Sequence, residues 1–212
     1  DLGCGVYTAV PPTIDGTIDD GEWEESASIF LGGESMAVKL TENYGGLKDL
    51  SGRVYVMWDK ENLYFGAKVE DNVHYQDRTG GGVWRGDSFQ IGIAHDATKV
   101  DSPDSQYESY THIMLAMNNE GVTTVHRMHG EDSSLKKADI ERAEMVVLRQ
   151  DTTTVYEAKI PWDEILPLEH LVEVGDGVNA SGILSDNENK RKVVSADSYI
   201  AFSVLLNDND GV

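Results

Sequence analysis

The residue best placed for chemistry is Trp84, within the stretch GGGVWRGDSFQIGI at residues 80–93. Three glycines and a valine precede it, and the tripeptide Arg-Gly-Asp at 85–87 leads into a strand-like segment. A tryptophan in such a loop either folds back into a core or is displayed to a ligand. The glycine run supplies little packing of its own, so the sequence favours display of Trp84.

The segment after Trp84 supplies polar neighbours. Phe89, Ile91 and Ile93 alternate and share one strand face, so Gln90 projects from the other face, nearest Trp84. The amide of Gln90 both donates and accepts hydrogen bonds, and Arg85 donates them. An indole can stack on the C–H face of a pyranose while such groups bind its hydroxyls. The alternative interpretation is that the Arg85 side chain is exposed to water and binds no ligand.

The other three tryptophans are predicted to serve packing. Trp58 shares a strand face with Val54 and Val56, Trp23 lies in the motif DGEW, and Trp162 lies at a strand-to-helix junction. A tryptophan flanked by apolar partners is usually part of a core. We therefore expect Trp84 to be the tryptophan available to a ligand.

Carboxylates near glycines form a second set of candidate functional residues, as possible metal ligands. Gly16 and Gly21 allow tight turns that bring carboxylates and carbonyls to one hard cation. The spacing is not that of an EF-hand, and the competing interpretation is that Asp-Gly pairs only form turns. The candidate calcium ligands are Asp15, Asp19, Asp20, Glu22, Asp71 and Asp87.

Composition excludes several classes of protein. Thirty-eight acidic residues against seventeen basic ones give a net charge of −21, which disfavours nucleic acid as a partner. No apolar run reaches the roughly 18 residues that a membrane span needs. One cysteine excludes an intrachain disulfide, and DLGCGVYTAV lacks the features of a signal peptide, although one could have been removed. No G-x-S-x-G, H-E-x-x-H or P-loop is present, so we expect no enzyme activity.

Extended segments dominate the chain. Residues 53–59 and 63–71 predict a β-hairpin, and further alternating runs recur with Gly, Asn, Asp and Pro between them. A short helix is expected at 161–166, another turn or two at 133–144, and a long loop at 175–197 that includes the sequon at Asn179. The pattern predicts one all-β domain over residues 1–212, an antiparallel β-sandwich of jelly-roll or immunoglobulin-like type.

Five phrases in register resemble the family 9 carbohydrate-binding modules, within the wider group of DOMON-related β-sandwiches. They are TIDGTIDDGEWEESASI, VYVMWDKENLYFGAKVEDNVH, VWRGDSFQIGI, YEAKIPWDEI and FSVLLNDNDG. The resemblance covers the chain from about residue 12 to its end. It implies a secreted or cell-surface module, attached to glycoside hydrolases or to other domains of a larger polypeptide. Members bind the end of a sugar chain between two tryptophans and carry structural calcium.

The resemblance also assigns residues. Trp84 matches one of the two clamp tryptophans, and Gln90 stands where the family has a carboxylate that binds sugar hydroxyls. His112, with Tyr110 as a second choice, matches a sugar-contacting residue of the following strand. The second clamp tryptophan follows the NDND segment in the family, but this sequence ends at Val212. Either the polypeptide continues further, or the clamp is incomplete.

Two other functions compete with polysaccharide binding. An assembly domain of a surface layer or filament would explain the acidic surface and the incomplete clamp. A haem b electron-transfer domain would need methionine with histidine or lysine ligands. The candidates for haem ligation are Met114, Met117, Met128, His112, His126 and His129.

Overall fold

The computed structural model describes residues 6–19, 21–33, 44–95, 110–131, 134–175, 190–194 and 200–211. No helix within these ranges is long and apolar enough to cross a membrane. The strands are β1 (Val6–Tyr7), β2 (Ala27–Gly32), β3 (Leu50–Trp58), β4 (Asn62–Asp71), β5 (Ser88–Ala94), β6 (Thr111–Met117), β7 (Thr123–His129), β8 (Ala138–Asp139), β9 (Glu144–Gln150), β10 (Thr153–Pro161), β11 (Val172–Gly175), β12 (Lys190–Val193) and β13 (Ala201–Asn207). The 3-10 helices are η2 (Gly80–Arg85), η4 (Trp162–Glu164) and η5 (Leu168–His170).

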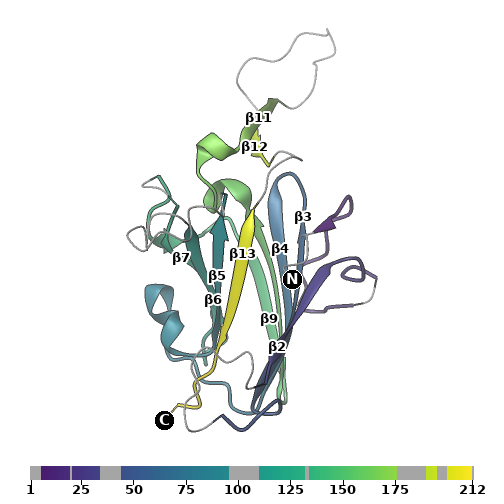
Figure 1. Cartoon of the computed structure of the whole chain (residues 1–212). Helices are drawn as coiled ribbons and strands as arrows, with labels where there is room; N and C mark the ends of the chain where they lie inside the picture. The colour runs from purple at the N-terminus through teal and green to yellow at the C-terminus, as the bar shows by residue number, and fades with distance from the viewer. Residues whose placement is uncertain are drawn as a thin grey trace.

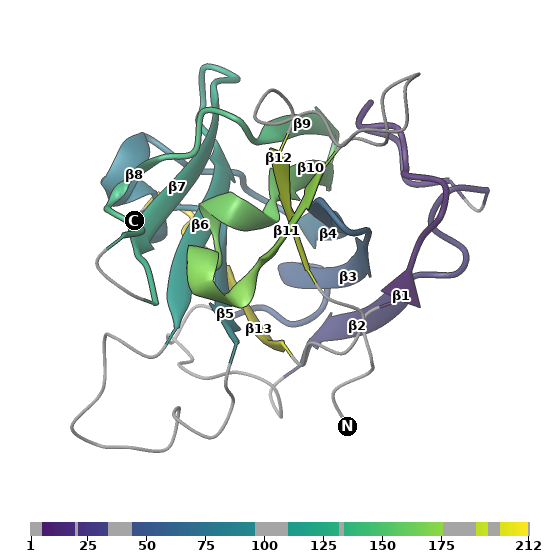
Figure 2. The same ribbon diagram turned by 90° about the horizontal axis from the view of Figure 1, so that it is seen from above.

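Most of these strands form two sheets that pack face to face (Figure 1). The first sheet has the order β1-β3-β4-β10-β9, with β2 also paired to β3, and the second has the order β13-β5-β6-β7-β8. Only the short β1 runs parallel to its neighbour among the described pairs. Strands β11 and β12 form a separate ribbon at one end of the sandwich, opposite the C-terminus (Figures 1 and 2).

The core lies between the two sheets and fixes the strand that follows Trp84. Phe89, Ile91 and Ile93 on β5 are fully buried. The ring of Phe89 meets Phe65 and Tyr156 of the other sheet edge-on, with centroid distances of 5.1 and 5.2 Å. Each such side chain contributes about 2 kcal/mol by leaving water. The alternation predicted for β5 is confirmed, and Gln90 therefore lies on the outer face.

The predicted β-sandwich is confirmed, and so is the hairpin, in which β3 and β4 pair antiparallel. Trp23 and Trp162 are buried as predicted, at 2% and 3% exposure. Trp58 is partly buried and packs against the main core. All three have the packing roles that their sequence contexts indicate.

Three local predictions differ from the structure. Residues 134–144 form the strand β8 and turns, because the Ile140 amide bonds the Val125 carbonyl and extends the edge of the second sheet. The helix at 161–166 is only the single turn η4, since Pro167 disfavours a helical conformation at the residue before it. Part of the expected loop at 175–197 pairs as β11 and β12, and Asn179 lies outside the described residues.

A buried carboxylate on β10 holds the N-terminal segment against the outer face of the first sheet. Glu157 has no exposed surface. It accepts hydrogen bonds from the amides of Asp15, Gly16 and Thr17 and from the indole of Trp23, at 2.8 Å for the latter. Burial raises the pKa of Glu157, and these four donors oppose that rise.

Candidate functional site

Trp84 is displayed by a turn that is itself firmly packed. Helix η2 lies against the outer face of the second sheet, beside β5, β6 and β7 (Figure 1). Val83 is fully buried in a small cluster with Met114, Ala116 and Met128. The next residue, Trp84, is 47% exposed. The exposure predicted for Trp84 is confirmed, and its contact with a ligand stays a prediction.

Polar side chains surround the base of Trp84. The guanidinium of Arg85 lies 5.0 Å from the centroid of the Trp84 ring, in a cation–π contact. Gln90 donates to the Asn207 side-chain carbonyl at 3.1 Å. Asn207 donates in turn to Ser88 Oγ at 2.9 Å and to the Trp84 carbonyl at 3.4 Å. The structure thus brings Trp84, Arg85 and Gln90 together, as the sequence predicts.

The C-terminal segment is the part of this site that sequence reasoning missed. Asn209 donates through its side chain to the Arg85 carbonyl, and its backbone amide donates to Asp87 Oδ1 at 2.8 Å. Asn207 and Asn209 come from the NDND sequence, about 120 residues away from the turn that they bind. In the sequence, the alternation of these asparagines with two aspartates was the only sign of a functional segment, and the same pattern is equally typical of turns.

Tyr110 and His112 lie further along the same outer face. His112 pairs with Gly92 of β5, two positions beyond Gln90. The Tyr110 ring meets His129 edge-on at 4.8 Å between centroids. Burial lowers the pKa of both His112 and His129, so both rings are neutral at neutral pH and each has one donor and one acceptor nitrogen.

Two of the six candidate haem ligands are buried in other contacts. Met114 is fully buried beneath Val83. His126 is also buried, and its Nδ1 contacts Asp139 Oδ1 at 2.5 Å. Neither of these two side chains is displayed to a haem.

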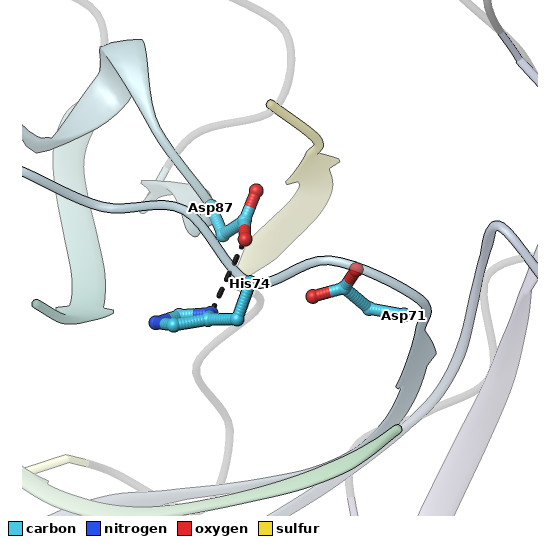
Figure 3. Close-up of side chains that lie close together, drawn as sticks. All are labelled: Asp71, His74 and Asp87. Carbon is cyan, nitrogen blue, oxygen red and sulfur yellow. Dashed lines mark ion pairs between the residues drawn. The ribbon is translucent and has the colours of Figure 1, made fainter. Parts of the chain in front are cut away.

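Asp71, His74 and Asp87 meet between β4 and β5 (Figure 3). His74 Nδ1 lies 3.2 Å from Asp87 Oδ2, and His74 Nε2 lies 2.9 Å from the Met117 carbonyl. A carbonyl only accepts, so both ring nitrogens donate when the imidazole is protonated. Asp87 accordingly raises the pKa of His74. When the imidazole is protonated, these contacts form an ion pair in which neither ring nitrogen keeps a lone pair for a metal.

A second group consists of the carboxylates of Asp71, Asp208 and Asp210, whose oxygens lie within 4.8 Å of one another. One oxygen of Asp210 is buried and has no partner among the described residues. Partial burial, followed by the charges of Asp210 and Asp87, raises the pKa of Asp208 to about 7. Arg149 lies 3.2 Å from Asp71 and is the cation beside this group. Three crowded carboxylates suit a divalent cation that prefers oxygen ligands.

The remaining predicted calcium ligands do not join this group. Asp15 accepts a hydrogen bond from the backbone amide two residues later in the chain, and Asp19 accepts them from the amides two and three residues later. Glu22 accepts hydrogen bonds from the amide and hydroxyl of Thr13. The contacts of Asp15 and Asp19 are turn contacts, as the competing interpretation proposed, and that of Glu22 joins it to Thr13 within the N-terminal segment. Asp20 lies outside the described residues. Of the six predicted ligands, the structure brings Asp71 and Asp87 to the carboxylate-rich region.

Comparisons with known proteins identify the family and agree with the fold. Residues 14–212 match the family described as "Carbohydrate family 9 binding domain-like". Two solved structures of a carbohydrate binding module family 9 from Caldicellulosiruptor kristjanssonii, one with cellotriose and one with glucose, have TM-scores of 0.52. Their sequence identities are 17% and 18%, with 97% of this chain and 77% and 79% of theirs covered. No curated protein sequence matches the chain. The family match spans nearly the whole sequence, so the chain belongs to the carbohydrate family 9 binding domain-like family.

Proposed function

We propose that the chain is a non-catalytic carbohydrate-binding module that holds a polysaccharide or the end of a sugar chain by stacking on Trp84. The observation that carries this proposal is an exposed indole on a packed turn beside a row of amide side chains. The family match and the cellotriose and glucose complexes of structures with the same fold support it.

The chemistry of the row suits sugar hydroxyls. Gln90, Asn207 and Asn209 each carry a donor and an acceptor group, and none is charged. A hydroxyl also donates and accepts, so neutral amides can pair with it without the cost of burying a charge. Arg85 adds a donor over the indole. Stacking supplies the apolar contact and the amides supply orientation.

In this role the module would tether a larger extracellular protein, such as a glycoside hydrolase, to its substrate. The strongly acidic surface would keep such a protein soluble through self-repulsion. The competing role is an assembly domain of a surface layer or filament, which needs no sugar site. Binding to carbohydrate separates the two roles.

The deciding experiment is a binding screen. The chain should bind at least one polymer among cellulose, xylan, mannan and β-glucan in pull-down assays. Titration calorimetry with cello-oligosaccharides should give dissociation constants between about 1 µM and 1 mM, the range expected of a small stacked site. A fluorescence change from the exposed tryptophan should accompany binding. If the chain binds none of these polymers and oligosaccharides, the assembly role is favoured.

We also propose that calcium binds Asp71, Asp208 and Asp210. The unpartnered buried oxygen of Asp210 and the raised pKa of Asp208 both indicate a site where negative charge lacks compensation. Asp208 and Asp210 flank Asn209, which bonds the turn that carries Trp84. A cation here would hold the C-terminal segment against that turn, so calcium would stabilise the sugar site without touching the sugar.

We expect calcium to raise the melting temperature, and to raise it more near pH 8 than near pH 5.5. Without calcium, the pKa of Asp208 in the folded state is about 7, above that of an ordinary carboxyl. Protonation therefore stabilises the calcium-free protein, and this contribution is lost as the pH rises through about 7. Calcium binds the deprotonated carboxylates, so its own effect grows over the same interval. Thermal unfolding in calcium and in EDTA at both pH values measures the difference.

Two variants locate the calcium site. Asp210→Asn should remove most of the shift caused by calcium, whereas Asp19→Asn should leave it unchanged, because Asp19 serves a local turn. The reverse result would place the ion in the N-terminal segment instead. An equal calcium shift at both pH values would contradict the role of Asp208.

A further inference from the structure

A continuous strip of side chains runs along the outer face of β5 and its neighbour β13. Successive outward positions on β5 are Ser88, Gln90 and Gly92, and their partners on β13 are Asn207, Leu205 and Ser203. Leu205 is 37% exposed, and Ser203 is exposed as well. Trp84 adjoins the strip at Asn207, and Tyr110 adjoins it at Gly92. We call this surface the β5 strip, and its members are Gln90, Gly92, Ser203, Leu205 and Asn207.

The end of the strip that is distant from Trp84 is formed by Gly92, with Ser203 and the Tyr110 ring packed beside it. A Cβ atom at Gly92 would lie 2.6 Å from Ser203 Oγ and 3.4 Å from the Tyr110 ring. The Tyr110 ring therefore lies beside bare backbone at Gly92. His129 meets that ring edge-on, which limits the orientations that it can adopt. Ser203 and Tyr110 thus close over Gly92, and the Tyr110 ring is a second aromatic surface on which a sugar can rest.

The spacing between the two ends matches a short oligosaccharide. Gly92, beside Tyr110, lies four positions along β5 from Ser88, beside Trp84. At the usual rise of a strand this is about 13 Å, comparable with the spacing of two sugars that lie two or three units apart in a chain. Between the ends lie the Gln90 amide, which can bond hydroxyls, and the exposed Leu205, which can contact a C–H face.

The Trp84 end offers a single stacking surface by itself. Arg85 lies over the indole at 5.0 Å, so one ring face is already covered by a side chain of the same turn. A single stacked sugar gains only a modest free energy, because the other side of its ring stays in water. Additional affinity has to come from sugars that extend beyond the one on Trp84.

We propose that the β5 strip binds a glycan lengthwise, from Trp84 to Tyr110, so that the module recognises several consecutive sugars within a chain rather than its end alone. This inference rests on the proposed carbohydrate-binding function and specifies its substrate class as an extended polysaccharide strand. Tyr110 then contacts the sugar two or three units away from the one that stacks on Trp84.

The test is titration calorimetry with cello-oligosaccharides from cellobiose to cellohexaose. Affinity should rise about tenfold or more between cellobiose and cellotetraose and then level off, since the strip is filled. Reduction of the terminal sugar to its alditol with borohydride should leave the affinity for cellohexaose unchanged. Tyr110→Ala should abolish the gain with length and leave cellobiose binding intact, and Tyr7→Ala, an exposed tyrosine of the other sheet, should change nothing.

The outcomes separate this inference from the function on which it rests. If affinity depends on Trp84 but not on chain length, or is lost when the terminal sugar is reduced, the module binds chain ends and the lengthwise mode is wrong. If neither these oligosaccharides nor any polymer of the binding screen binds, the carbohydrate-binding function itself fails. The length series and the reduced oligosaccharides use the unaltered chain, so the test does not depend on the folding of Tyr110→Ala.

Discussion

Replacement of Trp84 by alanine is expected to lower the affinity for cello-oligosaccharides about thirtyfold, equivalent to about 2 kcal/mol. The indole is the exposed aromatic surface beside the Gln90–Asn207 pair, and a methyl group cannot replace its stacking area. The amides alone would exchange bonds with water for bonds with hydroxyls at little net gain. Titration calorimetry measures the loss, and Trp84→Phe should recover part of it.

The same substitution should leave the fold intact. Trp84 is 47% exposed, and the anchor of its turn is the neighbouring Val83, so the free energy of unfolding should change by no more than about 0.5 kcal/mol. Phe30→Ala provides a matched control, because Phe30 is 43% exposed and lies under Arg53 at 5.8 Å, on the other sheet. If both variants weaken sugar binding equally, or if Trp84→Ala retains full affinity, stacking on Trp84 is wrong.

Local patterns in the sequence were enough to predict most of the strands and the display of Trp84. Phe89, Ile91 and Ile93 alternate with small or polar residues, and this period of two decides which face enters the core. Three glycines before Val83 and Trp84 indicated a loop that displays Trp84; the display is confirmed, but the segment is the packed 3-10 helix η2. Such features depend on residues close together in the chain, which is why the sequence reveals them.

Pairings between distant segments could not be predicted in the same way. The amides of Asn207 and Asn209 reach the Trp84 turn, and Asp208 and Asp210 reach Asp71, but no local period indicates either contact. For residues 134–144, helix propensity was outweighed by the backbone bond that extends the edge of the second sheet. The sugar site and the carboxylate group both depend on the tertiary contacts that residues 207–210 make with the Trp84 turn and with Asp71.

Glu157 is the clearest case of a residue that the sequence gives no means to recognise, and its loss should have the largest effect on stability. Glu157→Ala is expected to lower the free energy of unfolding by about 3 kcal/mol or more, because it leaves the amides of Asp15 and Gly16 and the Trp23 indole without their acceptor. For a chain of this length the melting temperature should fall by about 6–12 °C. Denaturant titration and thermal unfolding measure both quantities.

Two comparisons show whether the carboxylate or merely its bulk is responsible. Glu157→Gln keeps the shape but turns an amide donor toward backbone donors, so it should recover only part of the stability. Glu144→Ala removes an exposed carboxylate that pairs with Lys159 on the same sheet and should cost less than about 1 kcal/mol. Since Glu157 holds the N-terminal segment to the first sheet, folded Glu157→Ala should bind sugar normally. A loss of sugar affinity in the folded variant would show that the outer faces of the two sheets are coupled. Full stability of Glu157→Ala would contradict the stabilising role of Glu157.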